Sequence, residues 1–294
     1  MLKTSSENFL LRGVFAGELN GRFVLADTTA LCNDAIKIYD ADPVAAELFS
    51  SALTSTALLS PLLEGTEKYS VQWEYPGLLG KTLVDVNAHS DVRGLFSQPH
   101  LAASELKLDT VFGSEDGIVT VLKFDNGSII NSGSAKAPLA DFAGDLGFFF
   151  SVSDQIETEF ITAVRFNADP ENPVCGAAGM MLQAMPECNM DIFENCRKRT
   201  NTDEFRKILL SDTTAEKKLE KIADFLGLPV PAMELGTPPG FRCNCSRDRL
   251  LQTMKVMSAQ DLEDIFKDKD QTAVECRFCR QKYVFSRREL IKNG

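Results

Sequence analysis

Hydrophobic and polar positions alternate in several short runs within residues 10–166. Two runs flank Asn20-Gly21, a dipeptide that accepts the positive φ angles of a tight turn, and they predict an opening β-hairpin over residues 10–27. Later runs are rich in β-branched and aromatic residues and are separated by turn-forming dipeptides, which predicts a largely antiparallel sheet. They cover residues 69–75, 81–88, 92–97, 117–124 and 160–166.

Helix-like spacing of apolar residues appears in residues 28–65 and 137–155. Asp42 followed by Pro43 predicts a helix start, because an N-cap carboxylate accepts a backbone N–H and proline suits the first turn. Pro61 should kink or end that helix. The later stretch predicts a helix that packs on the sheet through Leu139, Phe142, Leu146, Phe149 and Phe150.

The character of the chain changes after Pro186, where the sequence becomes charged and helix-favouring. Its apolar residues recur at helical spacing and are interrupted at Ser211-Asp212, which predicts short amphipathic helices that need a partner surface. Prolines and glycines between residues 229 and 240 mark a further boundary. We therefore expect an α+β core domain with an antiparallel sheet and packed helices in residues 1–186, a helical linker in 187–240 and a small four-cysteine zinc module in 241–294.

Composition and charge exclude several classes of protein. The 294 residues are 44% hydrophobic and 25% charged, as in an ordinary globular chain. Residues 1–190 hold 25 acidic and 11 basic side chains (net −14), whereas residues 191–294 hold 17 and 20 (net +3). The acidic body disfavours a nucleic-acid partner. The opening MLKTSSENFLLRG lacks a signal-peptide core, and no window resembles a membrane span, so we expect a cytoplasmic protein without a membrane partner.

The cysteines carry the most specific pattern in the sequence. Cys243 and Cys245 form a C-x-C pair, and Cys276 and Cys279 form a C-x-x-C pair after 30 intervening residues. Two close thiol pairs can supply four soft ligands to a tetrahedral metal, and residues 191–294 contain no histidine, so an all-cysteine zinc site is predicted. So small a module has little core of its own, and metal binding would supply its folding energy.

The C-x-C spacing also favours reversible oxidation. A disulfide across a single residue closes a strained ring and is easily reduced again. Arginines beside the cysteines, among them Arg247, Arg249 and Arg277, can offset the charge of zinc-bound thiolates. A permanent structural zinc knuckle remains an alternative on spacing alone. A thiol oxidoreductase is a second one, although no βαβ pattern surrounds Cys276.

The other candidate residues have simpler explanations. Free cysteine packs like a small hydrophobic residue, and we expect this of Cys32, Cys175, Cys188 and Cys196, with a Cys188–Cys196 disulfide as the less favoured alternative. The two histidines, His89 and His100, are expected in solvated loops. No glycine-rich phosphate loop, Ser-His-Asp set or paired-carboxylate signature is present, so no enzymatic activity is predicted.

Both cysteine segments resemble those of a known family. FRCNCSRDRL (241–250) and VECRFCRQKYVF (274–285) are similar to the redox module of the heat shock protein 33 family of chaperones. The similarity extends to LADTTALCNDA (25–35), LADFAGDLGFFFSVSDQ (139–155) and GMMLQAMP (179–186). The chain departs from the family pattern at Ser153-Asp154-Gln155, where the family usually has Ser-Glu-Gln.

The resemblance implies a redox-regulated holdase that is inactive when reduced and zinc-bound, with one Zn²⁺ per chain held by all four cysteines. Oxidation would form the disulfides Cys243–Cys245 and Cys276–Cys279. Zinc would then leave, the linker would unfold, and the chain would form a homodimer that binds unfolding client proteins. The alternative function is a constitutive zinc-ribbon module that binds RNA or a protein partner.

Overall fold

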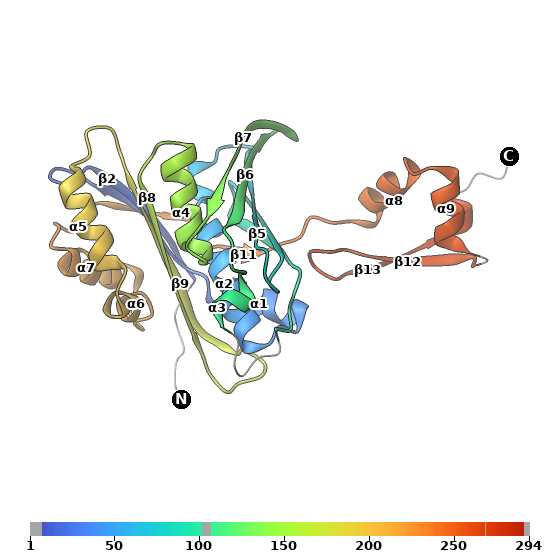
Figure 1. The fold of residues 1–294 in the computed structure, drawn as a ribbon, viewed down its shortest axis with the longest axis horizontal. Coiled ribbons are helices and arrows are strands. Elements are labelled where there is room, and N and C mark those ends of the chain that lie inside the picture. Colours follow the sequence, from blue (N-terminus) through green and yellow to red (C-terminus); the bar gives the residue numbers. More distant parts are fainter. Residues whose placement is uncertain (1–7, 102–106, 268, 291–294) are drawn as a thin grey trace. The chain divides into compact units, whose positions relative to one another are not determined.

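A computed structural model describes residues 8–101, 107–267 and 269–290 (Figure 1). The chain divides into two units, Met1–Phe241 and Arg242–Gly294, and each is described by itself.

Two β-sheets organise the first unit. The five-stranded sheet has the order β10-β1-β2-β9-β8, and the six-stranded sheet has the order β11-β5-β4-β3-β6-β7. All pairings are antiparallel except that of β11 with β5. The first sheet contains Met233–Gly236, Leu10–Phe15, Gly21–Asp27, Val174–Ala184 and Thr158–Phe166. The second contains Gly240–Phe241, Asp91–Phe96, Lys81–Asn87, Lys68–Glu74, Gly117–Asp125 and Ser128–Ala137. The α+β prediction is confirmed, with two sheets in place of the single one expected.

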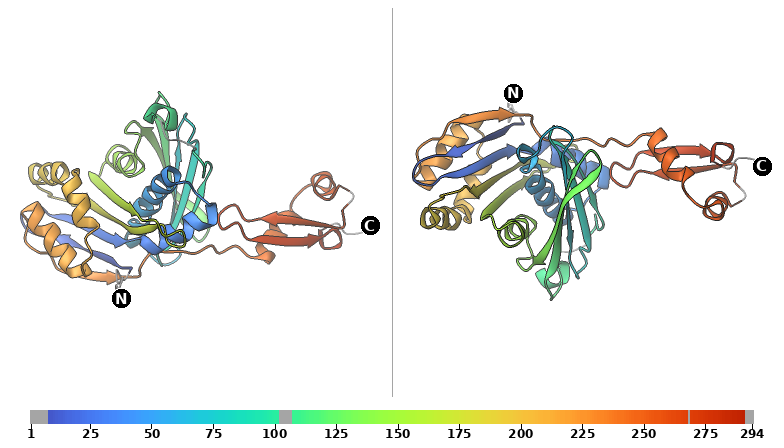
Figure 2. Two further views of the ribbon diagram at one scale, coloured as in Figure 1. Left: turned by 90° about the horizontal axis from the view of Figure 1, so that it is seen from below. Right: turned by 90° about the horizontal axis from the view of Figure 1, so that it is seen from above.

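Three helices form the layer between the sheets (Figure 2). They are α1 (Thr29–Tyr39), α2 (Pro43–Ala57) and α4 (Phe142–Ser153). Helix α2 touches β8 and β9 on one side and β4 and β5 on the other, so one large hydrophobic core joins both sheets. The buried Trp73 indole donates a hydrogen bond of 3.1 Å to the Phe142 carbonyl and so ties β3 to α4. The short helix α3 (Leu108–Val111) and the 3₁₀ turn η1 (Ser60–Leu62) lie in the same unit.

Local sequence signals identified several element boundaries. Asp42 caps α2 and accepts from the Ala45 N–H at 2.8 Å, and the helix ends at Ala57 before Pro61 enters a 3₁₀ turn. The opening hairpin is present, and Asn20 has a φ of 52°. However, its strands are joined by a five-residue loop, 16–20, so the two-residue turn expected at Asn20-Gly21 is wrong.

Two strands and one side chain differ from the sequence expectation. The sequence did not indicate β7 or β9, because both are rich in small or flexible residues and poor in β-branched ones. In β9, Gly179 lies against α2, where a Cβ atom would meet the Thr54 side chain at 2.6 Å. Leu139 precedes α4 and is 56% exposed, so its expected place on the packed face of this helix is wrong.

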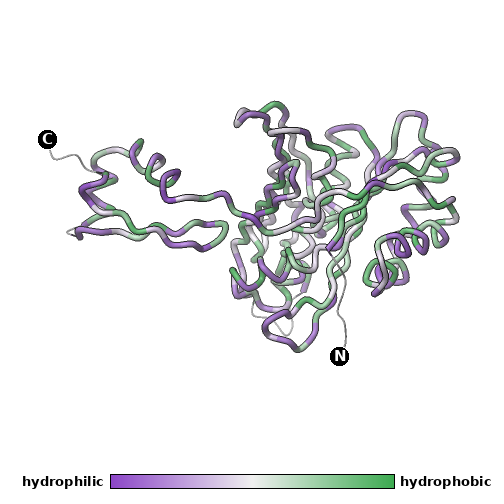
Figure 3. The backbone as a smooth tube through the Cα atoms, turned by 180° about the vertical axis from the view of Figure 1, so that it is seen from behind, coloured by the Kyte–Doolittle hydropathy of each residue, from purple (hydrophilic) through white to green (hydrophobic). Residues whose placement is uncertain are grey.

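The charged segment after Pro186 folds into three helices, α5 (Met190–Thr200), α6 (Asp203–Leu209) and α7 (Ala215–Leu226), which are called the linker helices, or the linker, below. They cover the face of the five-stranded sheet that lies away from α1, α2 and α4 (Figures 2 and 3). Strand β2 shows the arrangement, since Phe23 and Leu25 join the cluster with the linker helices while Val24 and Ala26 join the central core. Both faces of this sheet are therefore buried, and the predicted need of the amphipathic helices for a partner surface is confirmed.

The second unit is small. It comprises α8 (Arg247–Lys255), α9 (Ala259–Phe266), the hairpin of β12 (Gln271–Glu275) and β13 (Lys282–Ser286), and α10 (Arg287–Leu290). The predicted break between its first two helices is present, with the Ser258 side chain capping α9. Among the described residues of this unit, the buried apolar cluster consists of Met254, Leu262, Phe266, Phe285 and Leu290. In the described ranges of both units, no helix is long and apolar enough to cross a membrane.

We expect Phe205→Ala to release the linker helices from the sheet. Phe205 is fully buried in the cluster that joins the linker to the sheet and contacts Phe225 at a ring distance of 5.8 Å. Loss of a buried phenylalanine costs about 3–5 kcal/mol. Hydrogen exchange should therefore accelerate in residues 190–226 while residues 242–290 are unaffected. Leu235→Ala, at a side chain that is 70% exposed, is the control. Equal exchange in the two variants would contradict this expectation.

Candidate metal centre and linker interface

The four cysteines of the C-terminal unit come from two loops. Cys243 and Cys245 lie between β11 and α8, whose first turn is capped by the Ser246 side chain. Cys276 and Cys279 lie in the turn that joins β12 to β13. Antiparallel pairing of these strands brings Glu275 opposite Lys282 and so fixes both ends of the turn. Each thiol pair is thus carried on a short loop whose ends are held by regular structure.

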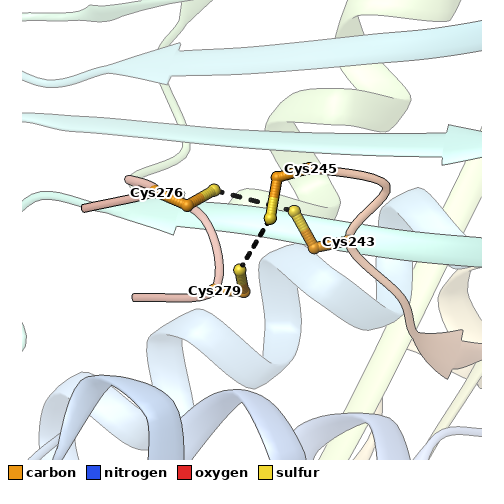
Figure 4. Close-up of side chains that lie close together, drawn as sticks. All are labelled: Cys243, Cys245, Cys276 and Cys279. Atoms are coloured by element: carbon orange, nitrogen blue, oxygen red, sulfur yellow. Dashed lines mark hydrogen bonds between the residues drawn. The ribbon is translucent and has the colours of Figure 1, made fainter. Parts of the chain in front are cut away.

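All four sulfur atoms point toward one another (Figure 4). They lie within 4.8 Å of each other, with 3.7 Å between the sulfurs of Cys243 and Cys276 and 3.3 Å between those of Cys245 and Cys279. Zinc binds thiolate sulfur at about 2.3 Å, so sulfurs at the corners of a tetrahedron around it lie roughly 3.8 Å apart. The cluster therefore fits a single metal ion with four sulfur ligands.

The thiols differ in their electrostatic surroundings. Burial raises the pKa of Cys243 and of Cys279. Burial also acts to raise the pKa of Cys276, but hydrogen bonds from the backbone N–H groups of Cys279 and Phe278, together with the thiols of Cys279 and Cys245, lower this pKa overall. A bound metal ion would place the same positive charge beside all four sulfur atoms. All four thiols would then be deprotonated, whatever their pKa values without the metal.

The arginines near the thiols have carboxylate partners as well. Arg247 forms an ion pair of 2.5 Å with Glu289 and lies over the Phe285 ring. Arg280 contacts Glu275 at 3.1 Å. These two guanidinium groups are therefore already paired within the module, which the sequence spacing had not indicated.

The remaining cysteines are separate from the cluster. Cys32 and Cys196 are buried, Cys175 and Cys188 are half-buried, and all are free thiols, as expected for packing residues. Burial raises the pKa of Cys32 to about 11, and it also raises the pKa values of Cys188 and Cys196. Such thiols react slowly. His89 and His100 are exposed in loops, as predicted.

A second group of charged residues joins the linker to the core. Arg197 of α5 contacts Glu157, the residue before β8, at 2.6 Å and Glu159 of β8 at 3.1 Å. It also contacts Glu194 of its own helix at 2.6 Å. Arg197, Glu157 and Glu159 line a cleft of about 1030 Å³, together with residues of α2, α4, β8 and the linker helices. Burial raises the pKa of Glu159 to about 7, and Arg197 only partly opposes this. No pattern in the sequence indicated this cluster of charges.

A buried lysine makes a further contact between the linker and the core. Lys218 of α7 is 3% exposed and donates to the Leu209 carbonyl at the end of α6. Burial lowers its pKa, whereas Asp27 at the end of β2 opposes this lowering electrostatically. Apolar packing therefore holds the linker on the sheet, and so do the contacts of Arg197 and Lys218 with acidic residues of the core. These contacts would be lost if the linker separated from the sheet.

The fold and the site define a two-unit α+β protein whose small C-terminal unit carries a cluster of four cysteines that could hold a metal ion. A family model described as Hsp33 protein matches residues 9–286, and the chain belongs to this family of chaperones, which is not a class of enzymes.

Curated relatives support this assignment along nearly the whole chain. The 33 kDa chaperonin of Bacillus pumilus is 28% identical over 275 residues, which cover 92% of either chain. That of Thermodesulfovibrio yellowstonii is 26% identical over 284 residues, covering 94% of this chain and 96% of the relative. The crystal structure of the 33 kDa chaperonin from Thermotoga maritima has a TM-score of 0.80 at 23% identity, covers 96% of each chain and shows the same fold.

Replacement of any one cluster cysteine by serine should lower metal binding. Reduced protein loaded with zinc is expected to hold about one ion per chain, because the four sulfurs surround a single position. Cys276→Ser should reduce the bound zinc severely, measured by elemental analysis after dialysis against a weak chelator. Cys188→Ser, which removes a half-buried thiol outside the cluster, should retain the full amount. Full zinc content in the Cys276 variant would contradict the assignment.

Docking of the linker should weaken as the pH rises from 4.5 to about 7. Because the pKa of Glu159 is raised from 4.5 to about 7 in the folded protein, the folded state binds the extra proton in this range, and stability falls as that proton is lost. Arg197, Glu194 and Asp141 face this carboxyl.

Glu159→Gln should therefore flatten the dependence of the melting temperature on pH between pH 5 and pH 7. Glu157→Gln removes another carboxylate from the same arginine and controls for the lost ion pair. An unchanged slope in the Glu159 variant would show that this carboxyl does not govern the pH dependence.

Proposed function

We propose that this chain is a redox-regulated holdase chaperone whose activity is set by the four-cysteine cluster. The observation that carries the proposal is the convergence of four sulfurs within 4.8 Å in a unit with a very small apolar core. Membership of the Hsp33 family supports the chaperone function. Such a unit depends on its metal for stability, and the loss of that metal is a change that the rest of the chain can sense.

The metal in the proposed mechanism is zinc, one ion per chain in the reduced form. Cys243, Cys245, Cys276 and Cys279 would hold it, because four thiolates without an open position are typical of a structural zinc site. When bound, the ion supplies folding free energy to the module and keeps the thiolates from reacting freely. The proposed division of the chain is a core domain in 1–186, a linker in 187–240 and a redox switch in 241–294.

Oxidation by a peroxide would remove the ligands in pairs. A thiolate attacks one peroxide oxygen, so that an S–O bond forms, the O–O bond breaks and hydroxide leaves, giving a sulfenic acid. A neighbouring thiolate then attacks that sulfur, forming the disulfide and releasing a second hydroxide. The proposed pairs are Cys243 with Cys245 and Cys276 with Cys279. The short contacts between the two loops make the alternative pairings Cys243–Cys276 and Cys245–Cys279 the ones to exclude by mass spectrometry.

Unfolding of the module would affect the linker because the two are joined by a short segment of the chain. Strand β11 (Gly240–Phe241) pairs with β5 over only two positions and ends two residues before Cys243. Strand β10 pairs with β1 over four positions immediately upstream. If the module unfolded, the residues after these two short strands would no longer be ordered, and the strand pairings would be less stable.

The proposed client surface is the apolar face that the linker covers. It includes Phe23, Leu25, Ile161, Met180 and Leu182 of the sheet, together with the inward faces of α5, α6 and α7. Unfolded proteins expose apolar side chains, and these associate with such a surface through the non-directional hydrophobic effect. The expected partners are thus unfolded or partly unfolded clients and, in the oxidised state, a second copy of the chain. A cytoplasmic location without nucleic-acid or membrane binding completes the proposal.

Three measurements on the full chain test the mechanism together. Peroxide treatment at elevated temperature is expected to release the zinc, reduce the far-UV circular dichroism signal of helix and switch on suppression of the aggregation of a denatured client. Subsequent reduction in the presence of zinc should reverse all three changes. Cys175→Ser should behave as the unmodified chain, because this thiol lies outside the cluster.

Two results would contradict the proposal. An oxidised protein that retains zinc and helix and does not bind clients would indicate a constitutive zinc-ribbon module instead. Disulfide-exchange turnover without zinc would indicate a thiol oxidoreductase, although the C-x-x-C turn joins two antiparallel strands and not the strand and helix of a βαβ unit.

A further inference from the structure

The sulfur atoms of the cluster obtain their hydrogen bonds from two kinds of donor. Backbone N–H groups of the loops themselves serve three of the sulfurs. Cys243 accepts from Cys245, Cys276 accepts from Cys279 and Phe278, and Cys279 accepts from Gln281. These donors are part of the loop conformation, so no side-chain replacement removes them directly.

Cys245 has a side chain as its partner. The hydroxyl of Tyr283 lies 3.2 Å from the Cys245 sulfur and 3.4 Å from the carbonyl oxygen of the same residue. A metal-bound thiolate carries no proton, so in the reduced, metal-bound form the phenol must be the donor. Tyr283 lies 38 positions further along the chain, and its contact therefore links the C-x-C loop to the opposite strand.

The tyrosine is itself held in place. It lies in β13, where its backbone is opposite Val274 of β12, and its ring packs against the small apolar cluster that contains Phe285. The ring thus supports the module by packing, while the oxygen atom reaches the metal centre. These two contributions can be separated, because phenylalanine retains the ring and lacks only the hydroxyl.

We propose that Tyr283 is a positioning residue of the cysteine cluster, whose hydroxyl orients the Cys245 thiolate toward the metal and restrains its reaction with electrophiles. This role rests on the metal centre of the proposed function. A hydrogen bond to a ligand fixes its direction, and loss of such a partner commonly lowers metal affinity by about 10–100-fold. The same bond withdraws electron density from the sulfur, so that the sulfur attacks an incoming electrophile more slowly.

Tyr283→Phe is the test, with zinc and iodoacetamide as the probes. In alkylation the Cys245 sulfur attacks the methylene carbon, an S–C bond forms and iodide leaves, so the reaction reports nucleophilicity without any redox step. We expect the zinc affinity of the reduced full-length variant to fall by about tenfold or more, measured by competition with a chromophoric chelator. Mass spectrometry of the zinc-loaded proteins should show that the variant is alkylated faster than the unmodified chain, and that this increase is larger at Cys245 than at the other three cysteines.

Thr253→Val is the matched control. It removes a hydroxyl from the same unit, where the Thr253 side chain donates to the Arg249 carbonyl in α8. Zinc affinity and alkylation rates in this variant should equal those of the unmodified chain. Circular dichroism of all three proteins at saturating zinc shows whether the module is folded in each.

Each outcome has a definite meaning. Unchanged affinity and unchanged alkylation in Tyr283→Phe would overturn the proposal, as would an equal acceleration at all four cysteines, which indicates general loosening of the module. If the unmodified chain itself bound no zinc, the proposed function would fail instead. Weaker zinc binding with selective exposure of Cys245 in a folded module would support the role of Tyr283.

Discussion

The fold of the small C-terminal unit depends on holding four thiol sulfur atoms within 4.8 Å of one another. Among its described residues, the apolar cluster of the unit that contains them has five buried side chains, a core too small to offset the conformational entropy of about 50 residues. In the proposed reduced state, metal coordination supplies the missing free energy through two loops whose ends are fixed by β12, β13 and α8. Whatever removes the ligands would therefore remove most of the stability of that unit.

Signals that act within a few residues made part of this arrangement predictable. Asp42 and Ser258 could be recognised as helix caps because an N-cap side chain contacts a backbone N–H only three residues away. The two cysteine pairs could be recognised as metal ligands from their spacing. The spacing of apolar residues after Pro186 likewise predicted amphipathic helices that need a partner surface. The family resemblance then supplied a function that spacing alone left open between a switch and a permanent knuckle.

The features that could not be predicted depend on contacts between distant parts of the chain. Strand β9 is rich in alanine, glycine and methionine because it is buried on both faces and lies against helix α2, a context that no local pattern reveals. Tyr283 reads as an ordinary strand residue until β13 places its hydroxyl beside Cys245. Arg197 similarly resembles any surface arginine on a charged helix until it meets Glu157 and Glu159.

The linker interface combines apolar area with buried charge, and this combination favours two discrete states. Partial separation would leave Lys218 and Glu159 in a low-dielectric environment without all of their partners, which is costly. Complete separation allows the same groups to hydrate, and much of that cost disappears. In the proposed mechanism the linker is therefore either docked or released, and a loss of zinc free energy in the module shifts the population between these states. The net charge of −14 over residues 1–190 would then oppose precipitation of the released form while its apolar sheet is exposed.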